Sequence, residues 1–354
     1  MSIRHIVVLP GDGIGPEVIA AALRVLAAAT ELFGLELQLE HGLIGATAVH
    51  ATGDPLPPVT RAAVSRAEAV LLGAVGDPSL DAAPRHQKPE TGLLALRKLL
   101  GVYANLRPVM IYPSLRNCSP LKPALLEHTD LLIVRELTGG LYYGEPRGND
   151  GVSAVNTLRY SRDEIARVAR VAFTAARGRR KRLLSVDKAN VLETSQLWRT
   201  VVTEMAQAYP DVTLEHIYVD YAAMRLVSDP GSIDVLLTEN LFGDILSDEA
   251  AVLVGSLGLL PSASLGDGPG LFEPIHGSAP PLAGKDVANP IGTIASVALL
   301  LRHGLGEATA AAAIDQAISA TIAEGYRTRD IAQPGDSVVG TREMTGQIAR
   351  RIRA

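Results

Sequence analysis

The sequence contains little cysteine, few aromatic side chains and no long hydrophobic run. Its 354 residues include a single cysteine, Cys118, so an intrachain disulfide framework is excluded and a reducing compartment is expected. No stretch approaches the ~20 apolar residues that cross a bilayer, and the apolar run before Pro10 is too short for a secretion signal. Because 47% of the residues are hydrophobic, the chain can still bury a sizeable core. These features predict a soluble, cytoplasmic protein without a membrane partner.

The charge balance excludes another class of partner. The formal net charge is −5, which provides no positive field to attract nucleic acid or an anionic membrane surface. The one basic run, 177–182, lies between a helix-like and a strand-like segment, so it is interpreted as a solvated helix end. We find no internal repeat, low-complexity tract or long linker, so any domain boundary is crossed by ordered chain.

Short β-branched or apolar runs alternate with helical patterns along most of the chain. The first run, 3–9, is followed by the turn PGDGIGP and by an Ala- and Leu-rich segment at about 17–32, which predicts a strand, a turn and a helix. Strands that alternate with helices predict an α/β fold with a largely parallel sheet covered on both faces. Further strands are predicted at 35–41, 69–76, 130–137, 182–188 and 232–240.

Two long segments match neither pattern. Residues 136–157 are rich in glycine and aromatic residues and are predicted to form an extended arm or an active-site loop. Residues 273–290 (EPIHGSAPPLAGKDVANP) contain several small-residue turns and one histidine. Long ordered loops are often functional, so the second segment is a candidate binding loop.

The turn GDGIG at 11–15 contains half of a dinucleotide-binding fingerprint. Glu40 lies near the end of the second predicted strand, where a ribose-binding acid would stand. The fingerprint needs a third glycine at its sixth position, however, and Pro16 occupies that position. We therefore predict a tight strand-to-helix turn instead of a Rossmann site, and close approach of this backbone to a ligand stays open.

Two aspartates, Asp244 and Asp248, stand four residues apart in the apolar segment NLFGDILSDEAA. On a helix they share one face and repel each other, and a cation bound between them would relieve that repulsion. The alternative is that Asp244 caps a helix after Gly243 while Asp248 faces solvent. The pair alone favours this alternative.

Other charged residues stand at the edges of apolar segments. Arg97, Arg107 and Arg135 would suit a small polycarboxylic acid if they converged, because a guanidinium binds a carboxylate through two hydrogen bonds. Singly, each also suits a structural ion pair. Lys188 and Asp220 end predicted strands, where open α/β sheets bind ligands, and a lysine beside a cation can accept a proton. A strand-terminal lysine in solvent is an equal alternative.

Taken together, these motifs resemble the β-decarboxylating dehydrogenases, the isocitrate/isopropylmalate dehydrogenase family. The resemblance extends over essentially the whole chain, from GDGIGPEV near the N-terminus to GTREM at 340–344. The segments that carry it are RELTGGLYYGEPRG, SVDKANVLE, TENLFGDILSDEAA, and GLLPSASLGDG followed by FEPIHGSAP. Chance agreement over motifs of this length is negligible.

The resemblance implies a two-domain fold unlike the Rossmann type. The first domain would comprise residues 1–102 and 256–354, and the second residues 103–255. Family members of this kind form homodimers through their second domains, so a second copy of the chain is the expected partner. The segment 136–157 would then be the dimer arm.

The resemblance also implies a metal ion and a reaction. Asp244 and Asp248 resemble ligands of Mg²⁺ or Mn²⁺, completed by Asp220 of the partner subunit, and such ions prefer oxygen ligands. The metal would hold the substrate's 2-hydroxyl and the neighbouring carboxylate while hydride leaves for NAD. Lys188 of the partner subunit resembles the base that takes the hydroxyl proton. Tyr142 corresponds to the acid that protonates the carbon after CO₂ has left.

The family's substrate carboxylates are bound by three arginines, to which Arg97, Arg107 and Arg135 correspond, and Asn190 would lie beside them.

The helical segment 89–98 (PETGLLALRK) carries the family's substrate preference. Glu90, Leu93 and Leu94 occupy the places that meet the branched alkyl group of 3-isopropylmalate, whose burial contributes ~1–3 kcal/mol. Isocitrate enzymes have smaller polar residues there for an additional carboxylate, which leucines cannot bind.

The loop at 273–290 resembles the family's adenine-nucleotide loop and implies NAD as cofactor, with Ile14 near the nicotinamide. The loop residues assigned to the cofactor are Glu273, His276, Gly277, Ser278, Ala279 and Asn289. One position departs from the family pattern. NAD-dependent members usually have an acid after HGSAP for the ribose hydroxyls, whereas this chain has Pro281. NADP-dependent isocitrate enzymes have Lys and Tyr there, and Pro281–Leu282 offers neither.

The predicted activity is NAD-dependent oxidative decarboxylation of 3-isopropylmalate to 4-methyl-2-oxopentanoate and CO₂, a step of leucine biosynthesis. The same chemistry on another 3-substituted malate, an isocitrate-like acid or tartrate is an alternative, because one methylene discriminates by only about 10–200-fold. An alternative of another class is a non-catalytic paralogue that regulates a partner subunit. The joint presence of Lys188, Tyr142, Asp220, Asp244 and Asp248 favours an enzyme.

Pro281 generates a first prediction. The variant Pro281→Asp restores an acceptor for the ribose hydroxyls, so the KM for NAD should fall. Initial rates at varied NAD measure this effect, and an unchanged KM would remove residue 281 from cofactor binding.

Overall fold

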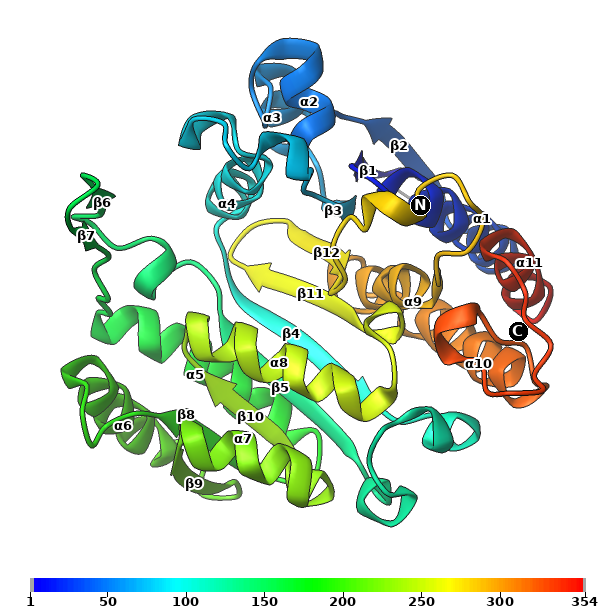
Figure 1. Ribbon diagram of the computed structural model, residues 1–354. Coiled ribbons are helices and arrows are strands. Elements are labelled where there is room, and N and C mark those ends of the chain that lie inside the picture. Colours follow the sequence, from blue (N-terminus) through cyan, green and yellow to red (C-terminus); the bar gives the residue numbers. More distant parts are fainter. Residues whose placement is uncertain (1–2, 353–354) are drawn as a thin grey trace. The chain divides into compact units, whose positions relative to one another are not determined.

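A computed structural model describes residues 3–352, which divide into two units (Figure 1). The first unit comprises the chain up to Val102, the segment Tyr112–Cys118 and the chain from Gly255 onward. The second comprises Tyr103–Ile111 and Ser119–Val254. The segment Tyr112–Cys118 therefore joins the first unit, although the sequence predicts it within the second domain.

Both units contain a sheet covered by helices, which confirms the predicted α/β class. The strands of the first unit are β1 (Arg4–Gly11), β2 (Leu37–His41), β3 (Ala69–Ala74), β11 (Pro261–Gly266) and β12 (Gly270–Pro274). Its helices are α1 (Gly15–Phe33), α2 (Gly45–Thr52), α3 (Pro58–Val64), α4 (Pro89–Leu100), α9 (Ile291–Leu299), α10 (Ala308–Ala323) and α11 (Thr341–Arg350).

The first unit's strands lie in the order β2-β1-β3-β12-β11, and all neighbours are parallel except β11 and β12. From β1 the chain crosses to β2 on one side and then back past β1 to β3 on the other. Because such crossovers are right-handed, the helices of the two connections lie on opposite faces of the sheet. Helix α1 packs with α9, α10 and α11, whereas α2 packs with α4 (Figure 1). The buried run Ala69–Ala74 lies in the middle of this sheet, as its continuous apolar sequence predicts.

The GDGIG turn is held by its own aspartate. The Asp12 carboxylate accepts hydrogen bonds from the backbone N–H groups of Ala46 (2.9 Å), Thr47 (2.8 Å) and Gly76 (2.9 Å). Asp12 therefore stabilises the N-terminus of α2, where an anion is favoured. Gly11 is required in the same turn because a Cβ atom would lie 1.9 Å from the carbonyl oxygen of Ala74.

In the second unit, five strands lie in the order β4-β5-β10-β8-β9. The strands are β4 (Val102–Met110), β5 (Asp130–Glu136), β8 (Arg182–Asp187), β9 (Thr213–Tyr218) and β10 (Val235–Thr238). The helices are α5 (Arg162–Arg177), α6 (Glu193–Ala206), α7 (Val219–Ser228) and α8 (Asn240–Val254). A two-stranded hairpin, β6 (Gly148–Asn149) and β7 (Ala154–Val155), stands apart from this sheet (Figure 1).

Helix α5 packs with α6, and α7 packs with α8. The chain runs from β5 through α5 to β8 and through α6 to β9, and it then returns in the opposite direction through α7 to β10. Right-handed connections in opposite directions lie on opposite faces, so the pair α5 and α6 covers one face of the sheet and the pair α7 and α8 covers the other. The capping box of α5 is complete, because Ser161 and Glu164 bond each other's backbone N–H groups. The basic run 177–182 lies at the end of α5, as predicted.

The register of this sheet brings the carboxyl ends of several strands to one edge. Thr238 of β10 pairs with Arg135 of β5 and with Val186 of β8, while Asp187 pairs with Tyr218 of β9. These four strands are parallel, so the residues that follow them emerge at the same edge, where α/β sheets bind ligands.

The predicted strands at 3–9, 35–41, 69–76, 130–137, 182–188 and 232–240 all form. Strand pairing is largely parallel, as predicted, and the antiparallel pairs are β4 with β5 and β11 with β12. One feature of the prediction needs correction. Asp220 does not end a strand, since β9 stops at Tyr218 and Asp220 lies in the first turn of α7.

The predicted arm at 136–157 contains one helical turn, η5 (Gly140–Tyr142), before the β6–β7 hairpin. Within residues 3–352, no helix is both long and apolar enough to cross a membrane.

Candidate active site

The carboxyl edge of the second unit's sheet brings together a buried arginine and a helical aspartate. Arg135, at 1% exposure, lies near the end of β5. Its guanidinium donates hydrogen bonds to Asn240 Oδ1 from Nε (3.1 Å) and Nη2 (2.8 Å), and Nη1 is paired with Asp244. A buried guanidinium needs such partners, so Arg135 fixes the first turns of α8 against β5.

Glycine is required at position 243 for this contact. A Cβ atom there would lie 2.6 Å from Arg135 Cγ and 2.8 Å from Arg135 Cβ. The alternative that Asp244 caps a helix after Gly243 is wrong, because α8 begins at Asn240 and Asp244 lies in its second turn.

Tyr142 reaches the same aspartate from the other side. Its hydroxyl donates to Asp244 Oδ2 at 2.8 Å. Burial raises the pKa of Tyr142 to about 12, and the hydrogen bond to the Asp244 carboxylate acts in the same direction. The phenol therefore keeps its proton throughout the neutral range.

Arg107 comes from β4 to the neighbouring turn of α8. Its Nε donates to Asn105 Oδ1 at 2.6 Å, and Nη1 donates to the Ser247 hydroxyl. Its guanidinium also lies 3.7 Å from Asp244 and 3.8 Å from Asp248. Two of the three predicted carboxylate-binding arginines thus converge on the helix that carries the aspartate pair.

Asp244 and Asp248 offer oxygen ligands suited to a divalent cation. Partial desolvation raises the pKa of Asp248 and repulsion from Asp244 adds to this, although Arg107 acts in the opposite direction. A carboxylate has about four lone-pair sites, so Asp244 can accept from Tyr142 and Arg135 and still bind an ion. No group of three potential metal ligands forms among the described residues of this one chain.

Lys188 and Asp220 form a second group at the same sheet edge. Their side chains are ion-paired, and the hydrogen bond from Lys188 lowers the pKa of the Asp220 carboxyl. Lys188 follows β8 directly, and Ser195 Oγ accepts its backbone N–H at 3.1 Å. Asn190 lies exposed in the turn after Lys188. The lysine is therefore next to an acidic partner instead of free in solvent.

In the first unit, helix α4 presents the predicted substrate residues on one face. Glu90, Leu93, Leu94 and Arg97 follow the i, i+3, i+4, i+7 spacing of a helix face. Glu90 is exposed and the two leucines are half-buried. Arg97 is buried and donates to Glu273 of β12 at 2.9 Å. This pair links a residue assigned to the substrate with one assigned to the cofactor.

The predicted cofactor loop packs on the GDGIG turn. The backbone N–H of Ile14 donates to the carbonyl of Ser278 at 2.7 Å, and Ile14 and Val18 form an apolar cluster with Ala279. A Cβ atom at Gly13 would lie 2.0 Å from the Ser278 carbonyl oxygen. Glycine in this turn thus serves close packing of the loop, which explains the incomplete fingerprint.

The loop itself has features of a ligand-binding segment. Burial lowers the pKa of His276, whose Nε2 atom is buried without a hydrogen-bond partner among the described residues. Ala279 has a left-handed backbone (φ 38°), which a non-glycine residue rarely adopts and which clusters at ligand sites. Asn289 is tied to Asp330 (3.0 Å), and Pro281 lies exposed in the turn η8 (Pro280–Leu282). An unsatisfied imidazole nitrogen suits a nucleotide base as partner.

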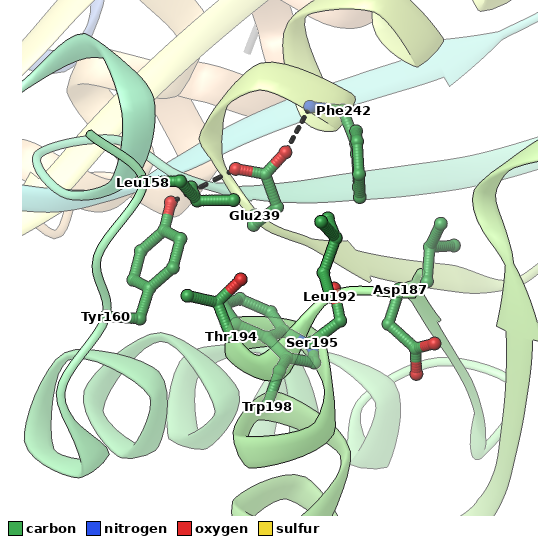
Figure 2. A pocket seen from close by; sticks show the side chains of 10 residues that line it. Leu158, Tyr160, Asp187, Leu192, Thr194, Ser195, Trp198, Glu239 and Phe242 are labelled. Atoms are coloured by element: carbon green, nitrogen blue, oxygen red, sulfur yellow. Dashed lines mark hydrogen bonds between the residues drawn. The ribbon is translucent and has the colours of Figure 1, made fainter. Parts of the chain in front are cut away.

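A buried polar cluster at this edge was not expected from the sequence. Tyr160 lies between two buried carboxylates, and its hydroxyl is within hydrogen-bond distance of Glu136 (3.2 Å) and Glu239 (3.3 Å). Figure 2 shows Glu239 between Tyr160 and the backbone of Phe242, beside a small cavity that Leu192 and Trp198 help to line. Residues this far apart in sequence leave no local pattern.

Other contributors did leave a local signal. Asn240, Ser247 and the two aspartates follow the spacing 240, 244, 247, 248, which is one face of a helix. Asn240 and Ser247 bind Arg135 and Arg107 on that face. The helical period could therefore have identified both.

Comparison with known proteins gives the family. The model of the isocitrate/isopropylmalate dehydrogenase family matches residues 5–348. The chain belongs to this family.

Relatives and solved structures agree with the assignment. The chain is 55% identical to a 3-isopropylmalate dehydrogenase of Synechococcus sp. (strain JA-3-3Ab), over 97% of this chain and 92% of that protein. It is 54% identical to a 3-isopropylmalate dehydrogenase of Nitrosomonas europaea, over 99% of both. The crystal structure of isocitrate dehydrogenase from Methylococcus capsulatus is similar with a TM-score of 0.89 and 36% identity, covering 99% of this chain and 100% of that one.

The buried cluster generates a prediction about pH. Burial raises the pKa of Glu136 from 4.5 to about 7. A raised folded-state pKa contributes stability that is complete below the unfolded pKa and is lost as pH rises through the folded value. Glu136→Gln removes this titration. As pH rises from 4.5 to 7, the free energy of unfolding of the variant should therefore increase relative to that of the wild type, by on the order of 3 kcal/mol.

Thermal or urea unfolding of both proteins across this pH range measures the difference. Glu31→Gln, on the exposed face of α1, is the control and should follow the wild-type curve. Parallel curves for Glu136→Gln and the wild type would contradict the prediction.

Proposed function

We propose that the protein oxidises 3-isopropylmalate with NAD and decarboxylates the product to 4-methyl-2-oxopentanoate, a step of leucine biosynthesis. The observation that carries this proposal is the 52–55% identity, over nearly the full length, to relatives named 3-isopropylmalate dehydrogenase. The cluster of Arg107, Arg135, Tyr142 and the aspartate pair supports it chemically. A biosynthetic enzyme acting on free metabolites fits the cytoplasm.

The side chains of the second unit have separate roles in this proposal. Arg107 and Arg135 bind the substrate carboxylates, because both guanidiniums lie beside the partly exposed Asp244 side chain of α8. Asp244 and Asp248 would hold Mg²⁺ or Mn²⁺ together with Asp220 of the partner subunit. When bound, the ion supplies a Lewis acid and NAD supplies the hydride acceptor.

Two residues move protons. Tyr142 donates a proton to the carbon that has lost CO₂, and its pKa of about 12 keeps the phenol protonated for this step. Lys188 of the partner subunit takes the proton of the 2-hydroxyl group. Its ion pair with Asp220 fixes the position of the amine at this sheet edge.

The first unit provides specificity and the cofactor loop. Leu93 and Leu94 on α4 are half-buried apolar side chains that suit an isopropyl group and cannot bind a further carboxylate. Isocitrate is nevertheless the informative comparison substrate, because of the 36% identity to an isocitrate dehydrogenase. The His276 Nε2 atom, which has no hydrogen-bond partner within residues 3–352, supports binding of the adenine nucleotide on the loop at 273–290.

The proposed enzyme is a homodimer with shared sites. Exposed apolar side chains gather on the packed helices α7 and α8, where Tyr221 (53%), Met224 (66%), Ile245 (58%) and Val252 (49%) face solvent in the single chain. Exposed apolar surface of this kind marks protein interfaces, in which Met and Tyr are enriched. Asp220 adjoins this surface on α7, as a ligand donated to a second subunit would.

The activity test is NADH formation at 340 nm with 3-isopropylmalate, isocitrate, homoisocitrate, malate and tartrate, each with NAD and NADP. We expect kcat/KM for 3-isopropylmalate with NAD to exceed that for isocitrate and homoisocitrate by about 100-fold or more, because a leucine-lined site rejects an additional carboxylate. Malate and tartrate should be at least about 10-fold poorer substrates, because they lack the isopropyl group that the leucines would bury. EDTA should abolish turnover, and Mg²⁺ or Mn²⁺ should restore it. Preference for another acid would overturn the assignment of Leu93 and Leu94, and absence of turnover with all pairs would favour a regulatory paralogue.

The shared site makes a separate prediction. Lys188→Ala and Asp244→Asn dimers should each be inactive, but a mixture dissociated and reassociated should regain about a quarter of wild-type activity. Half of its dimers are mixed, and each has one intact site in a two-fold assembly. Reassociated single variants are the control. No recovery in mixed dimers shown to form would place Lys188 and Asp244 in one subunit's site.

A further inference from the structure

The hydroxyl of Tyr160 lies where three segments of the second unit meet. It accepts a hydrogen bond from the backbone N–H of Asn240, the first residue of α8, at 3.1 Å. It also lies within hydrogen-bond distance of Glu136 Oε2, at the end of β5, and of Glu239 Oε2, just before α8. Tyr160 itself precedes α5 and is only 6% exposed.

Each carboxylate in this cluster holds a backbone segment. Glu239 accepts from the N–H groups of Phe242 (2.7 Å) and Leu241 (3.2 Å), so it caps the helix that carries Asp244 and Asp248. Glu136 accepts from Thr138 (3.0 Å) and Gly139 (2.8 Å), so it holds the turn that leads to Tyr142.

The turn also packs directly on the Tyr160 side chain. A Cβ atom at Gly139 would lie 2.7 Å from the tyrosine ring, and one at Gly140 would lie 2.3 Å from its hydroxyl oxygen. Asn240 ties the same turn to α8, because its Nδ2 donates to the carbonyls of Leu137 (3.1 Å) and Gly139 (3.0 Å). The Oδ1 atom of the same amide accepts hydrogen bonds from the Arg135 guanidinium.

We propose that Tyr160 is a positioning residue: its hydroxyl joins β5, the turn 137–142 and the first turn of α8, and thereby holds Tyr142 and Arg135 on Asp244. It touches neither the reacting atoms nor Asp244 and acts through Asn240 and the two glutamates. The effect on turnover rests on the proposed function, whereas the effect on the local structure does not.

Tyr160→Phe tests the inference with little change in packing, because phenylalanine keeps the edge-on contact with Trp198 (ring centroids 5.7 Å apart). We expect kcat to fall about 10- to 100-fold with a smaller change in the KM for 3-isopropylmalate, since a misplacement of about 1 Å has effects of this size. Tyr209→Phe, whose ring stacks on Phe173 in the same unit, is the matched control and should retain wild-type kcat.

A double-mutant cycle separates positioning from general destabilisation. If Tyr160 acts through Tyr142, the Tyr160→Phe/Tyr142→Phe double variant should be nearly as active as Tyr142→Phe alone. Fully additive losses, or a kcat for Tyr160→Phe within about 2-fold of the wild type, would overturn the proposal.

Amide hydrogen exchange provides a readout that does not depend on activity. Peptides covering 137–142 and 239–244 should exchange about 10-fold faster in Tyr160→Phe, while peptides of α6 and α7 keep the wild-type rate. Unchanged exchange in both segments would overturn the inference. A wild-type protein that turns over none of the substrates would refute the proposed function, and the exchange result would still decide the role of Tyr160.

A second pair of variants covers the case in which Tyr160→Phe does not fold. Glu239→Ala removes the cap and the acceptor near Tyr160, so kcat should fall about 10-fold. Glu239→Gln keeps a side-chain acceptor and should return kcat to within about 3-fold of the wild type. Equal activity of Glu239→Ala and the wild type would count against the cluster.

Discussion

The buried guanidinium of Arg135 is the interaction on which the candidate site depends. Arg135 is only 1% exposed, and a charged side chain this deeply buried is costly without partners. Asn240 and Asp244 of α8 are its partners. Because both partners lie on one face of α8, the arginine sets the rotation of that helix about its axis. The direction in which Asp248 points then follows from the helical period.

The same constraint explains small residues nearby. Gly243 leaves room for the Arg135 side chain, although alanine there would have a higher helix propensity by about 1 kcal/mol. Gly139 and Gly140 leave room for Tyr160. At these positions glycine lowers helix propensity and raises the entropy cost of folding. In return, it allows close contact between the strand, the turn and the helix that carry the polar side chains.

The two units use the ends of strands in different ways. In the second unit, parallel strands β5, β10 and β8 bring charged side chains to one edge. In the first unit, the end of β1 is packed by a loop from the other end of the chain, through the Ile14–Ser278 backbone hydrogen bond. A half-complete glycine fingerprint thus serves loop packing, which agrees with membership of a family that does not have the Rossmann fold.

The sequence by itself determined the α/β class, six of the strands, the basic helix end and the family, because each depends on local periodicity or on a contiguous motif. The contacts of the candidate site depended on the tertiary structure. Examples are Arg135 with Asp244, Arg97 with Glu273, and the cluster around Tyr160, whose members are 24 and 79 residues from it. Hydrogen-bond partners this far apart are selected by strand register and helix rotation, and neither quantity is present in the local pattern of residues.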